Sequence, residues 1–529
     1  MQEAVQLTLK PIAQQDKVVR LQTTVSIPDA HYAAGELFDS IPISVATCPG
    51  AGYREGQIAA SDELGAVEIT ISRTVGICGP QYSYCFARDV AGRLELTYTF
   101  DARDRDPYGR DPGFTFCRHD RGATVSGINF LLLPQEERFY RVCFDLSDFS
   151  EPALAVAGGH QGDFSGRYSP DDLKFIYYAF GYLTEYHREG SKLHVYSLDD
   201  DDKYFAELAG ITGEYFDYME RFFHDEDLSY NIILYPSKRT RLTGTAQQRC
   251  CYLGFGAELI EELSGIENVL AHELVHNWCV IEDSQSLSSL YAEGTAEYYS
   301  CYMQYHTGRA SEEEYVDAIN RKLRDYYSNP FREGAYEETF AKSWTHAFAQ
   351  RIPYSKGLVL LMQLDVLIRR KSDGKSCLDD VVLSIIDDAR LAKATDWADF
   401  AARVNHITEG EAQAMIDSAM TSGLLLPPEN YFGEDYELVE TTVGVECEGF
   451  DYTVRFEPEK VIHGLIPSSN AEKAGLRNGD KILSMVSGYD SGAKQISATR
   501  CKVLRDGEEL SFAYVARGEN VSCWQYRKK

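Results

Sequence analysis

The segment His272-Glu273-Leu274-Val275-His276 constrains this chain more than any other part of its sequence. Positions i and i+4 of an α-helix share a face, so the two imidazoles can reach a single metal ion while the glutamate lies beside it. Each imidazole would bind zinc through a ring nitrogen at about 2.0–2.1 Å. The pattern is short and also arises by chance on surface helices, so a third ligand is needed to support a metal site.

Glu293 is the candidate third ligand, because it lies 17 residues after His276 and precedes a glycine. One class of zinc peptidases instead places a glycine and then a histidine shortly after the second motif histidine. Cys279 and Glu282 occupy those positions, so that class is excluded. Glu297, one helical turn beyond Glu293, could accept a hydrogen bond from a ligand histidine. The alternative for both glutamates is an ordinary exposed charge on a helix.

Three protein ligands with an open fourth position are typical of a catalytic zinc. In such a site Glu273 would act as general base, taking a proton from zinc-activated water and passing it to the leaving amine. Tyr354 stands at the start of a predicted helix and could donate its hydroxyl to the oxyanion of a tetrahedral intermediate. One tyrosine among 35 is weak evidence by itself. Together these residues predict metal-assisted hydrolysis of a peptide bond, with one zinc per chain.

The composition is that of a globular protein with an acidic surface. The chain has 529 residues, 44% of them hydrophobic, and a net charge of −30. Such a surface repels phosphate backbones, so we expect no nucleic-acid partner; the alternative meaning of the charge is solubility alone. The uninterrupted apolar runs are too short for a membrane-spanning helix, so we expect no membrane partner.

The cysteine residues and the N-terminal segment indicate in which cellular compartment the protein resides. The chain has 13 cysteines, an odd number without any Cys-x-x-Cys pair, which favours a reducing compartment over a disulfide framework. From Met1 to Ala30 there is neither a basic nor an apolar signal segment. We therefore expect a cytoplasmic protein, although a chain trimmed after a secretion signal would look the same.

The hydrophobic periodicity divides the chain into three parts and predicts a multidomain α+β fold. Residues 1–165 alternate apolar and polar side chains, as from Val5 to Leu9, which predicts an N-terminal antiparallel β domain with one solvated face. Residues 166–428 begin with strand-like runs and continue with helical periodicity, which predicts a small sheet followed by a helical bundle. Residues 429–529 return to short β runs.

Several segments occur in the same order in gluzincin aminopeptidases. They are His272–Trp278, Ala292–Gly294 with Tyr298 and Tyr299, and Tyr354–Gly357. With its additional C-terminal part, the chain resembles the glycyl aminopeptidase family over nearly its whole length. The resemblance implies an N-terminal β domain, a thermolysin-like catalytic domain with a mixed sheet and a helical bundle, and a C-terminal PDZ domain. It also implies a zinc site made of His272, His276 and Glu293, with Glu273 as general base and Tyr354 as oxyanion donor.

The PDZ part of the resemblance rests on Ala474-Gly475-Leu476 followed by Gly479-Asp480, a pattern typical of this domain type. PDZ domains bind extended peptide ends by adding a strand to a sheet edge. The resemblance therefore implies a peptide or protein ligand for this part of the chain. The alternative is a structural appendage that binds no peptide.

Two departures from the family concern the substrate. Relatives carry a Gly-Gly-x-Glu-His type motif before the metal helix, and its glutamate would hold the α-ammonium group of the substrate. The matching residues here are Gly244, Thr245, Ala246 and Gln247, so we expect a substrate-binding stretch with a weakened, neutral anchor. The gap between the second histidine and the glutamate ligand is also shorter than in related aminopeptidases. These differences leave exopeptidase and endopeptidase activity both open.

Three functions compete at this point. The first is a zinc metallopeptidase acting on peptide substrates, with removal of N-terminal residues favoured over internal cleavage. The second is an inactive or weak zincin-fold scaffold that binds peptides or partners through its PDZ-like domain, a reading supported by Gln247. The third is a zinc hydrolase for a non-peptide substrate, for which the chain offers nothing positive. The intact Glu273 favours the first, because a scaffold needs no general base between two metal ligands.

Overall fold

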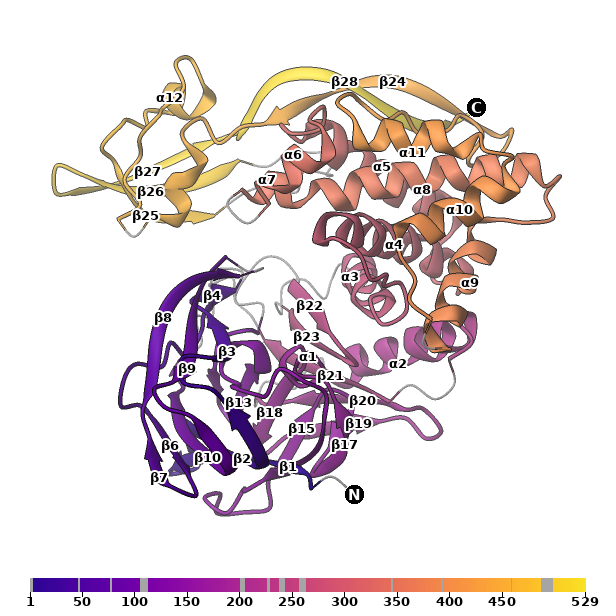
Figure 1. Cartoon of the computed structure of the whole chain (residues 1–529). Coiled ribbons are helices and arrows are strands. Elements are labelled where there is room, and N and C mark those ends of the chain that lie inside the picture. Colours follow the sequence, from indigo (N-terminus) through magenta and orange to yellow (C-terminus); the bar gives the residue numbers. More distant parts are fainter. Residues whose placement is uncertain are drawn as a thin grey trace. The chain divides into compact units, whose positions relative to one another are not determined.

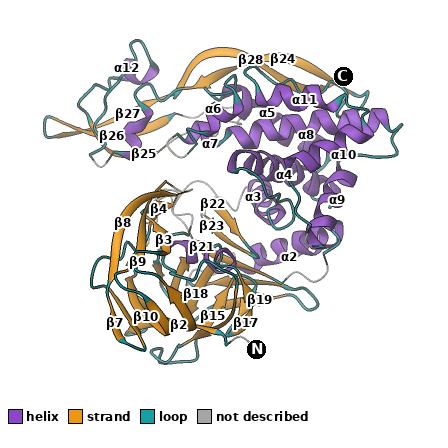
Figure 2. Ribbon diagram, in the orientation of Figure 1, coloured by secondary structure: helices purple, strands orange, loops and turns teal. Residues whose placement is uncertain are grey.

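The computed structural model describes most of the chain (Figure 1). The described residues are 3–45, 48–76, 79–104, 113–199, 205–225, 229–236, 243–255, 263–343, 346–391, 393–457, 459–486 and 498–529. They form two compact units, Met1–Asn277 and Trp278–Lys529. Strands predominate in the first unit, whereas the second begins with helices and ends with strands (Figure 2).

A seven-stranded sheet begins the first unit. Its strands in spatial order are β17 (Phe164–Tyr168), β14 (Arg138–Phe144), β1 (Val5–Gln14), β2 (Lys17–Tyr32), β10 (Val90–Asp101), β6 (Ile58–Asp62) and β7 (Gly65–Val67). Side chains along β1 alternate between buried and half-buried, as the sequence predicted. The antiparallel prediction was wrong for two pairs: β1 and β14 are parallel, with Leu7 opposite Val142, and so are the short strands Arg103–Asp104 and Cys117–His119. Alternation determines which face a side chain occupies, not the direction of the neighbouring strand.

A six-stranded sheet shares one hydrophobic core with the first sheet. Its strands are β11 (Arg103–Asp104), β12 (Cys117–His119), β13 (Gly122–Ser126), β18 (Tyr177–Gly181), β15 (Leu154–Ala157) and β16 (His160–Gln161). There are two smaller sheets. One contains β3 (Leu37–Pro42), β9 (Gly79–Phe86) and β8 (Ile69–Gly76), and the other pairs β4 (Ser44–Val45) with β5 (Cys48–Pro49). Strands β17 and β18 pair with strands that precede residue 165. Strand pairing therefore continues past the predicted boundary at 165, which stays a prediction.

A five-stranded mixed sheet follows, in the order β19 (Thr184–His187), β20 (Leu193–Ser197), β21 (Tyr230–Pro236), β23 (Cys250–Phe255) and β22 (Thr243–Gln247). Strands β20, β21 and β23 are parallel, while the two outer strands are antiparallel to their neighbours. This confirms the small mixed sheet. The helices of this region are α1 (Pro170–Lys174), α2 (Phe205–Phe222) and α3 (Leu263–Val275). Helix α3 packs against both α2 and the edge strand β22.

The predicted helical bundle is confirmed at the start of the second unit. Its helices are α4 (Gln285–His306), α5 (Glu312–Ser328), α6 (Tyr336–Phe340), α7 (Ala347–Gln350), α8 (Ile352–Lys371), α9 (Leu378–Arg390), α10 (Trp397–Ile407) and α11 (Ala412–Met420). Helices α4 and α8 pack along each other, and α8 has a proline in its first turn. Within the described residues, no helix combines the length and apolarity that a bilayer crossing requires.

Short strands return in the C-terminal part. A two-stranded ribbon pairs β24 (Tyr436–Glu446) with β28 (Arg517–Lys528), and both strands pack on α5. A three-stranded sheet contains β25 (Lys481–Val486), β26 (Thr499–Arg505) and β27 (Glu508–Tyr514), with α12 (Asn470–Ala474) beside it. Gly475 ends α12 with a φ of 106°, which is why this turn needs glycine. The PDZ-like assignment of residues 429–529 remains a prediction.

Candidate metal centre

The two motif histidines lie at the end of α3. His272 is in the last turn of this helix and is buried, while His276 follows the last helical residue, Val275, and is half-buried. The helix was expected to continue through His276, so its end differs from the prediction. The turn continues the helical path, because the N–H of Asn277 donates to the carbonyl of Leu274 at 3.1 Å. The two imidazoles consequently still meet, with 3.2 Å between their Nε2 atoms and 83° between the ring planes.

Glu293 of α4 completes the group. One carboxylate oxygen of Glu293, one ring nitrogen of His272 and one ring nitrogen of His276 all lie within 4.8 Å of one another. Two ligands bound at about 2.05 Å to a tetrahedral zinc would be about 3.3 Å apart, close to the observed Nε2 separation. Among the described residues, no other set of three His, Cys, Asp or Glu side chains meets this criterion. Two imidazoles and one carboxylate are a donor set that fits zinc.

Two helix glycines explain how α4 comes so close to α8. A Cβ added to Gly294 would lie 2.8 Å from the Cα of Gly357, a distance that real side chains do not tolerate. The two backbones therefore touch directly beside Glu293. Tyr354 lies in the first turn of α8, one turn before Gly357 and on the same helix face. The crossing thus brings the helix of the predicted oxyanion donor next to the helix of the third ligand.

Glu273 is held against the edge strand β22. Its side chain is buried, and a Cβ on Gly244 would lie 2.6 Å from its Cγ and Oε1 atoms. Only glycine leaves room for the carboxylate at this distance. Burial and then the Glu273 carboxylate raise the pKa of Cys251 well above its usual value, which is consistent with the packing of α3 on this sheet. The predicted general base therefore has a fixed position beside the motif histidines.

The predicted substrate-binding residues form strand β22. Side chains alternate along a strand, so Gly244 and Ala246 share the face toward Glu273, while Thr245 and Gln247 point the other way. The amide of Gln247 is within 2.8 Å (Nε2) and 3.1 Å (Oε1) of the Ser126 hydroxyl. Ser126 was missed from the sequence because it ends a buried strand without any motif around it.

Glu297 lies one turn after Glu293 on α4, as predicted. Its carboxylate accepts a hydrogen bond from the Nζ atom of Lys322 on α5 at 2.5 Å. Burial, the largest effect, lowers the pKa of Lys322, but Glu297, Cys301 and Asp325 together outweigh it and the pKa is raised. The role of Glu297 as a hydrogen-bond acceptor for a ligand histidine remains a prediction.

No protein-family model matches the chain, and no curated protein matches it. Solved structures do resemble it. The crystal structure of an aminopeptidase N family protein from Idiomarina loihiensis is similar over 99% of this chain and 98% of that chain, with a TM-score of 0.65 and 14% identical residues. Yeast leukotriene A4 hydrolase in complex with bestatin is similar over 80% of this chain and 68% of that chain, with a TM-score of 0.51 and 14% identity. These likenesses show a shared fold.

Proposed function

We propose that this protein is a zinc metallopeptidase that hydrolyses peptide bonds. The observation that carries the proposal is the convergence of the three ligand side chains, His272, His276 and Glu293, within 4.8 Å. The shared fold with an aminopeptidase N family protein supports it. When bound, zinc supplies Lewis-acid polarisation of a carbonyl oxygen and of water. The protein supplies the remaining chemistry through its own side chains.

Glu273 is the proposed general base. It takes a proton from the attacking water and delivers it to the leaving amine, a task that needs a carboxylate held within hydrogen-bond reach of the reacting atoms. Its buried position against Gly244 restricts its movement. A fixed carboxylate does not have to be reoriented during the reaction, which lowers the entropic cost of proton transfer.

Tyr354 is the proposed donor to the oxyanion. Its place in the first turn of α8, beside the crossing of Gly294 and Gly357, puts it on the helix that packs next to Glu293. A hydroxyl aimed at the developing negative charge stabilises the tetrahedral intermediate more than the substrate. Losing such a donor commonly costs a factor of about 10² to 10³ in kcat.

For specificity, we propose an aminopeptidase similar to the glycyl aminopeptidases, with residues 429–529 as a PDZ-like domain. The fold shared with an aminopeptidase N family protein supports this choice. Gln247 is the main argument for weak selection of a free amino terminus, because its neutral amide pairs with the neutral hydroxyl of Ser126. A neutral pair attracts an ammonium group less than a carboxylate does.

The second candidate is a scaffold that binds peptides or partners without cleaving them. Gln247 favours it, because a lost ammonium anchor is expected when catalysis is no longer selected. Glu273 argues against it, since the base is retained and Gly244 leaves room for its side chain. A scaffold would require neither feature.

The decisive variant is Glu273→Gln, which keeps the size of the side chain but removes the base. We expect the variant to retain about one zinc per chain and to lose hydrolysis of both aminoacyl and internally quenched peptides by at least about 10³-fold. Glu282→Gln, an exposed change in the same region, serves as the control and should keep wild-type activity. Equal activity of Glu273→Gln and wild type, or no hydrolysis of any peptide by the zinc-loaded wild type, would overturn the proposal.

The anchor argument has its own test in Gln247→Glu. The added carboxylate should raise hydrolysis of substrates with a free amino terminus and leave N-acetylated substrates unaffected. Gln248→Glu adds the same charge at the next position, which is exposed. This control variant should change the rates on substrates with free and with acetylated amino termini equally. An unchanged or lower rate on substrates with a free amino terminus would show that Gln247 does not contact the substrate's ammonium group.

A further inference from the structure

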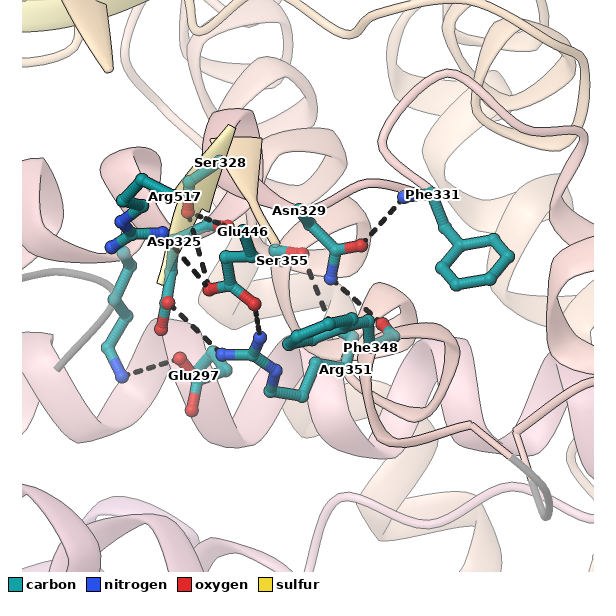
Figure 3. Close-up of polar contacts among 11 residues, drawn as sticks. Glu297, Asp325, Ser328, Asn329, Phe331, Phe348, Arg351, Ser355, Glu446 and Arg517 are labelled. Carbon is teal, nitrogen blue, oxygen red and sulfur yellow. Dashed lines mark hydrogen bonds and ion pairs between the residues drawn. The ribbon is translucent and has the colours of Figure 1, made fainter. Parts of the chain in front are cut away.

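A cluster of charged and polar residues surrounds Glu446 at the end of β24. We call it the Glu446 cluster; its members are Asp325, Ser328, Arg351, Glu446 and Arg517. Figure 3 shows the Glu446 carboxylate among the other members, with hydrogen bonds and ion pairs drawn as dashed lines. The Glu446 side chain is 0% exposed and that of Arg517 is 5% exposed. Charges buried this far from water persist only when they are paired.

One contact of the cluster joins Glu446 to Arg351. The Nη2 atom of Arg351 donates to Glu446 Oε2, and its Nη1 atom lies 3.3 Å from Asp325 Oδ1. Ser328 Oγ donates to the other Glu446 oxygen at 3.4 Å, and Arg517 Nη1 lies 3.8 Å from it. Arg351 is thus held by carboxylates from two elements, α5 and β24. Its planar guanidinium is suited to such a divided contact.

Arg351 is also the N-cap residue of α8. It is the residue before the first helical position, and its carbonyl accepts bonds from the N–H and the Oγ of Ser355 at 3.4 and 3.2 Å. Its guanidinium lies over the ring of Phe348, 5.2 Å from the centroid. Tyr354 lies within this first turn. The ion pair with Glu446 is therefore anchored at the backbone that carries the proposed oxyanion donor.

Helix α5 connects the same cluster to the helix of the third metal ligand. Lys322 pairs with Glu297 of α4, and Asp325, one turn further along α5, pairs with Arg351. Glu297 in turn lies one turn beyond Glu293. Two successive ion pairs on one face of α5 thus fix the helix of Glu293 and the start of the helix of Tyr354.

We propose that Glu446 is a positioning residue for the hydrolysis: it holds Arg351 and thereby fixes the first turn of α8 with Tyr354. The inference rests on the proposed function, in which Tyr354 donates to the oxyanion. It makes the C-terminal ribbon of β24 and β28 part of the support of the catalytic machinery. Small displacements of such a donor are costly, because a misplacement of about 1 Å can lower a rate about 10²-fold.

The first test compares steady-state kinetics of Glu446→Ala and Glu446→Gln. We expect Glu446→Ala to lower kcat by about tenfold to hundredfold with an unchanged KM and about one zinc per chain. Glu446→Gln keeps an acceptor oxygen for Arg351 and should recover a large part of the loss. Arg351→Lys, which keeps the charge at a partly exposed position but loses the planar fork, should lower kcat as well, and serves if Glu446→Ala does not fold.

The matched control lies on the same helix. Asp365 is a buried carboxylate of α8 with 6% exposure, paired with Arg369 at 2.8 Å, and it lies about 16 Å from Tyr354 along the helix. Asp365→Asn should lower stability but leave kcat within about twofold of wild type. Equal kcat losses in Asp365→Asn and Glu446→Ala would reduce Glu446 to a purely structural role and overturn the proposal.

A second readout does not depend on activity. Hydrogen exchange of the amides from Ser355 to Gly357 should become faster in Glu446→Ala, whereas Asp365→Asn should affect the far end of α8. Unchanged exchange in the first turn of α8 in Glu446→Ala would overturn the positioning role even in an active enzyme. If the zinc-loaded wild type hydrolyses no peptide, the proposed function fails, and with it the catalytic meaning of the support. Exchange would then still show whether Glu446 fixes this turn.

Discussion

Gly294 and Gly357 meet where α4 crosses α8, so closely that a Cβ on Gly357 would lie 2.7 Å from the Cα of Gly294. Glycine inside a helix costs about 1 kcal/mol relative to alanine, so two facing helix glycines need a compensating gain. The compensating gain is the close approach of α4 and α8, which larger residues at these two positions would prevent. Because Glu293 precedes one glycine and Tyr354 lies one turn before the other, the crossing sets the distance between the two helices at the candidate site.

Replacing either glycine by alanine should separate the helices. Gly357→Ala is expected to lower the free energy of unfolding by about 1–3 kcal/mol, because backbone atoms obstruct the new methyl group and cannot move aside as a side chain would. The shift of Glu293 relative to Tyr354 should lower kcat at least about tenfold. Urea denaturation and peptide hydrolysis measure the two effects.

Gly210 of α2 provides the control for this prediction. A Cβ there meets only the Tyr186 hydroxyl at 3.9 Å, an ordinary contact. Gly210→Ala should therefore stabilise the protein by about 0.5–1 kcal/mol through helix propensity alone. A Gly357→Ala variant that is as stable and active as Gly210→Ala would contradict the account of the crossing.

Gly244→Ala tests whether packing against Gly244 positions the proposed general base, Glu273. The methyl group would lie 2.6 Å from Glu273 atoms, so the carboxylate has to move. We expect about a tenfold to hundredfold loss of kcat while the zinc content stays at about one per chain, because the ligands are not displaced. Gly210→Ala, whose Cβ meets only an ordinary contact, serves as the control and should keep the kcat of wild type. Loss of zinc in Gly244→Ala would instead indicate that α3 as a whole is displaced.

Lys356 should make stability depend on pH. It is 0% exposed, and its ammonium donates to the carbonyls of Gly334 and Thr421, both at 3.1 Å. Burial lowers its pKa from 10.5 to about 8. The folded state therefore binds fewer protons than the unfolded state between these values, so this contribution to stability is present above pH 10.5 and is lost as the pH falls through 8.

The measurement compares wild type with Lys356→Met by urea denaturation at pH 8 and pH 10. Stability of the wild type relative to the variant should rise by about 2 kcal/mol over this interval. Lys375→Met, an exposed change just beyond α8, should show no such difference in slope. A difference that stays constant with pH would mean that Lys356 titrates normally.

Local patterns predicted most of the candidate site. The spacing of His272 and His276 follows from helix geometry, Glu293 was expected 17 residues further on a following helix, and the structure brings these three residues together. The start of a helix at Tyr354 was an equally local prediction, and the structure confirms it. Such features depend on residues a few positions apart, whose interactions hardly change with the rest of the fold.

Long-range partners could not be predicted. The parallel pairing of β1 with β14, the contact of Gln247 with Ser126 and the ion pair of Arg351 with Glu446 each join residues about 100 positions or more apart. Nothing in the local sequence distinguishes such partners from other residues of the same type. The sequence gives only a weak indication that Gly294 and Gly357 lie at a close helix crossing, because both glycines interrupt helical sequence beside functional residues. Periodicity alone gives no reason to pair them.

The central claim is that His272, His276 and Glu293 bind one zinc ion. The most direct measurement is anomalous scattering at the zinc edge from crystals of the zinc-loaded protein, combined with metal analysis of wild type, Glu293→Gln and the exposed control Glu282→Gln. We predict a single anomalous peak within about 2.0–2.2 Å of two imidazole nitrogens and one Glu293 oxygen, with weakened zinc binding only in Glu293→Gln. A peak elsewhere, no peak, or a Glu293 side chain that does not reach the ion would contradict the account.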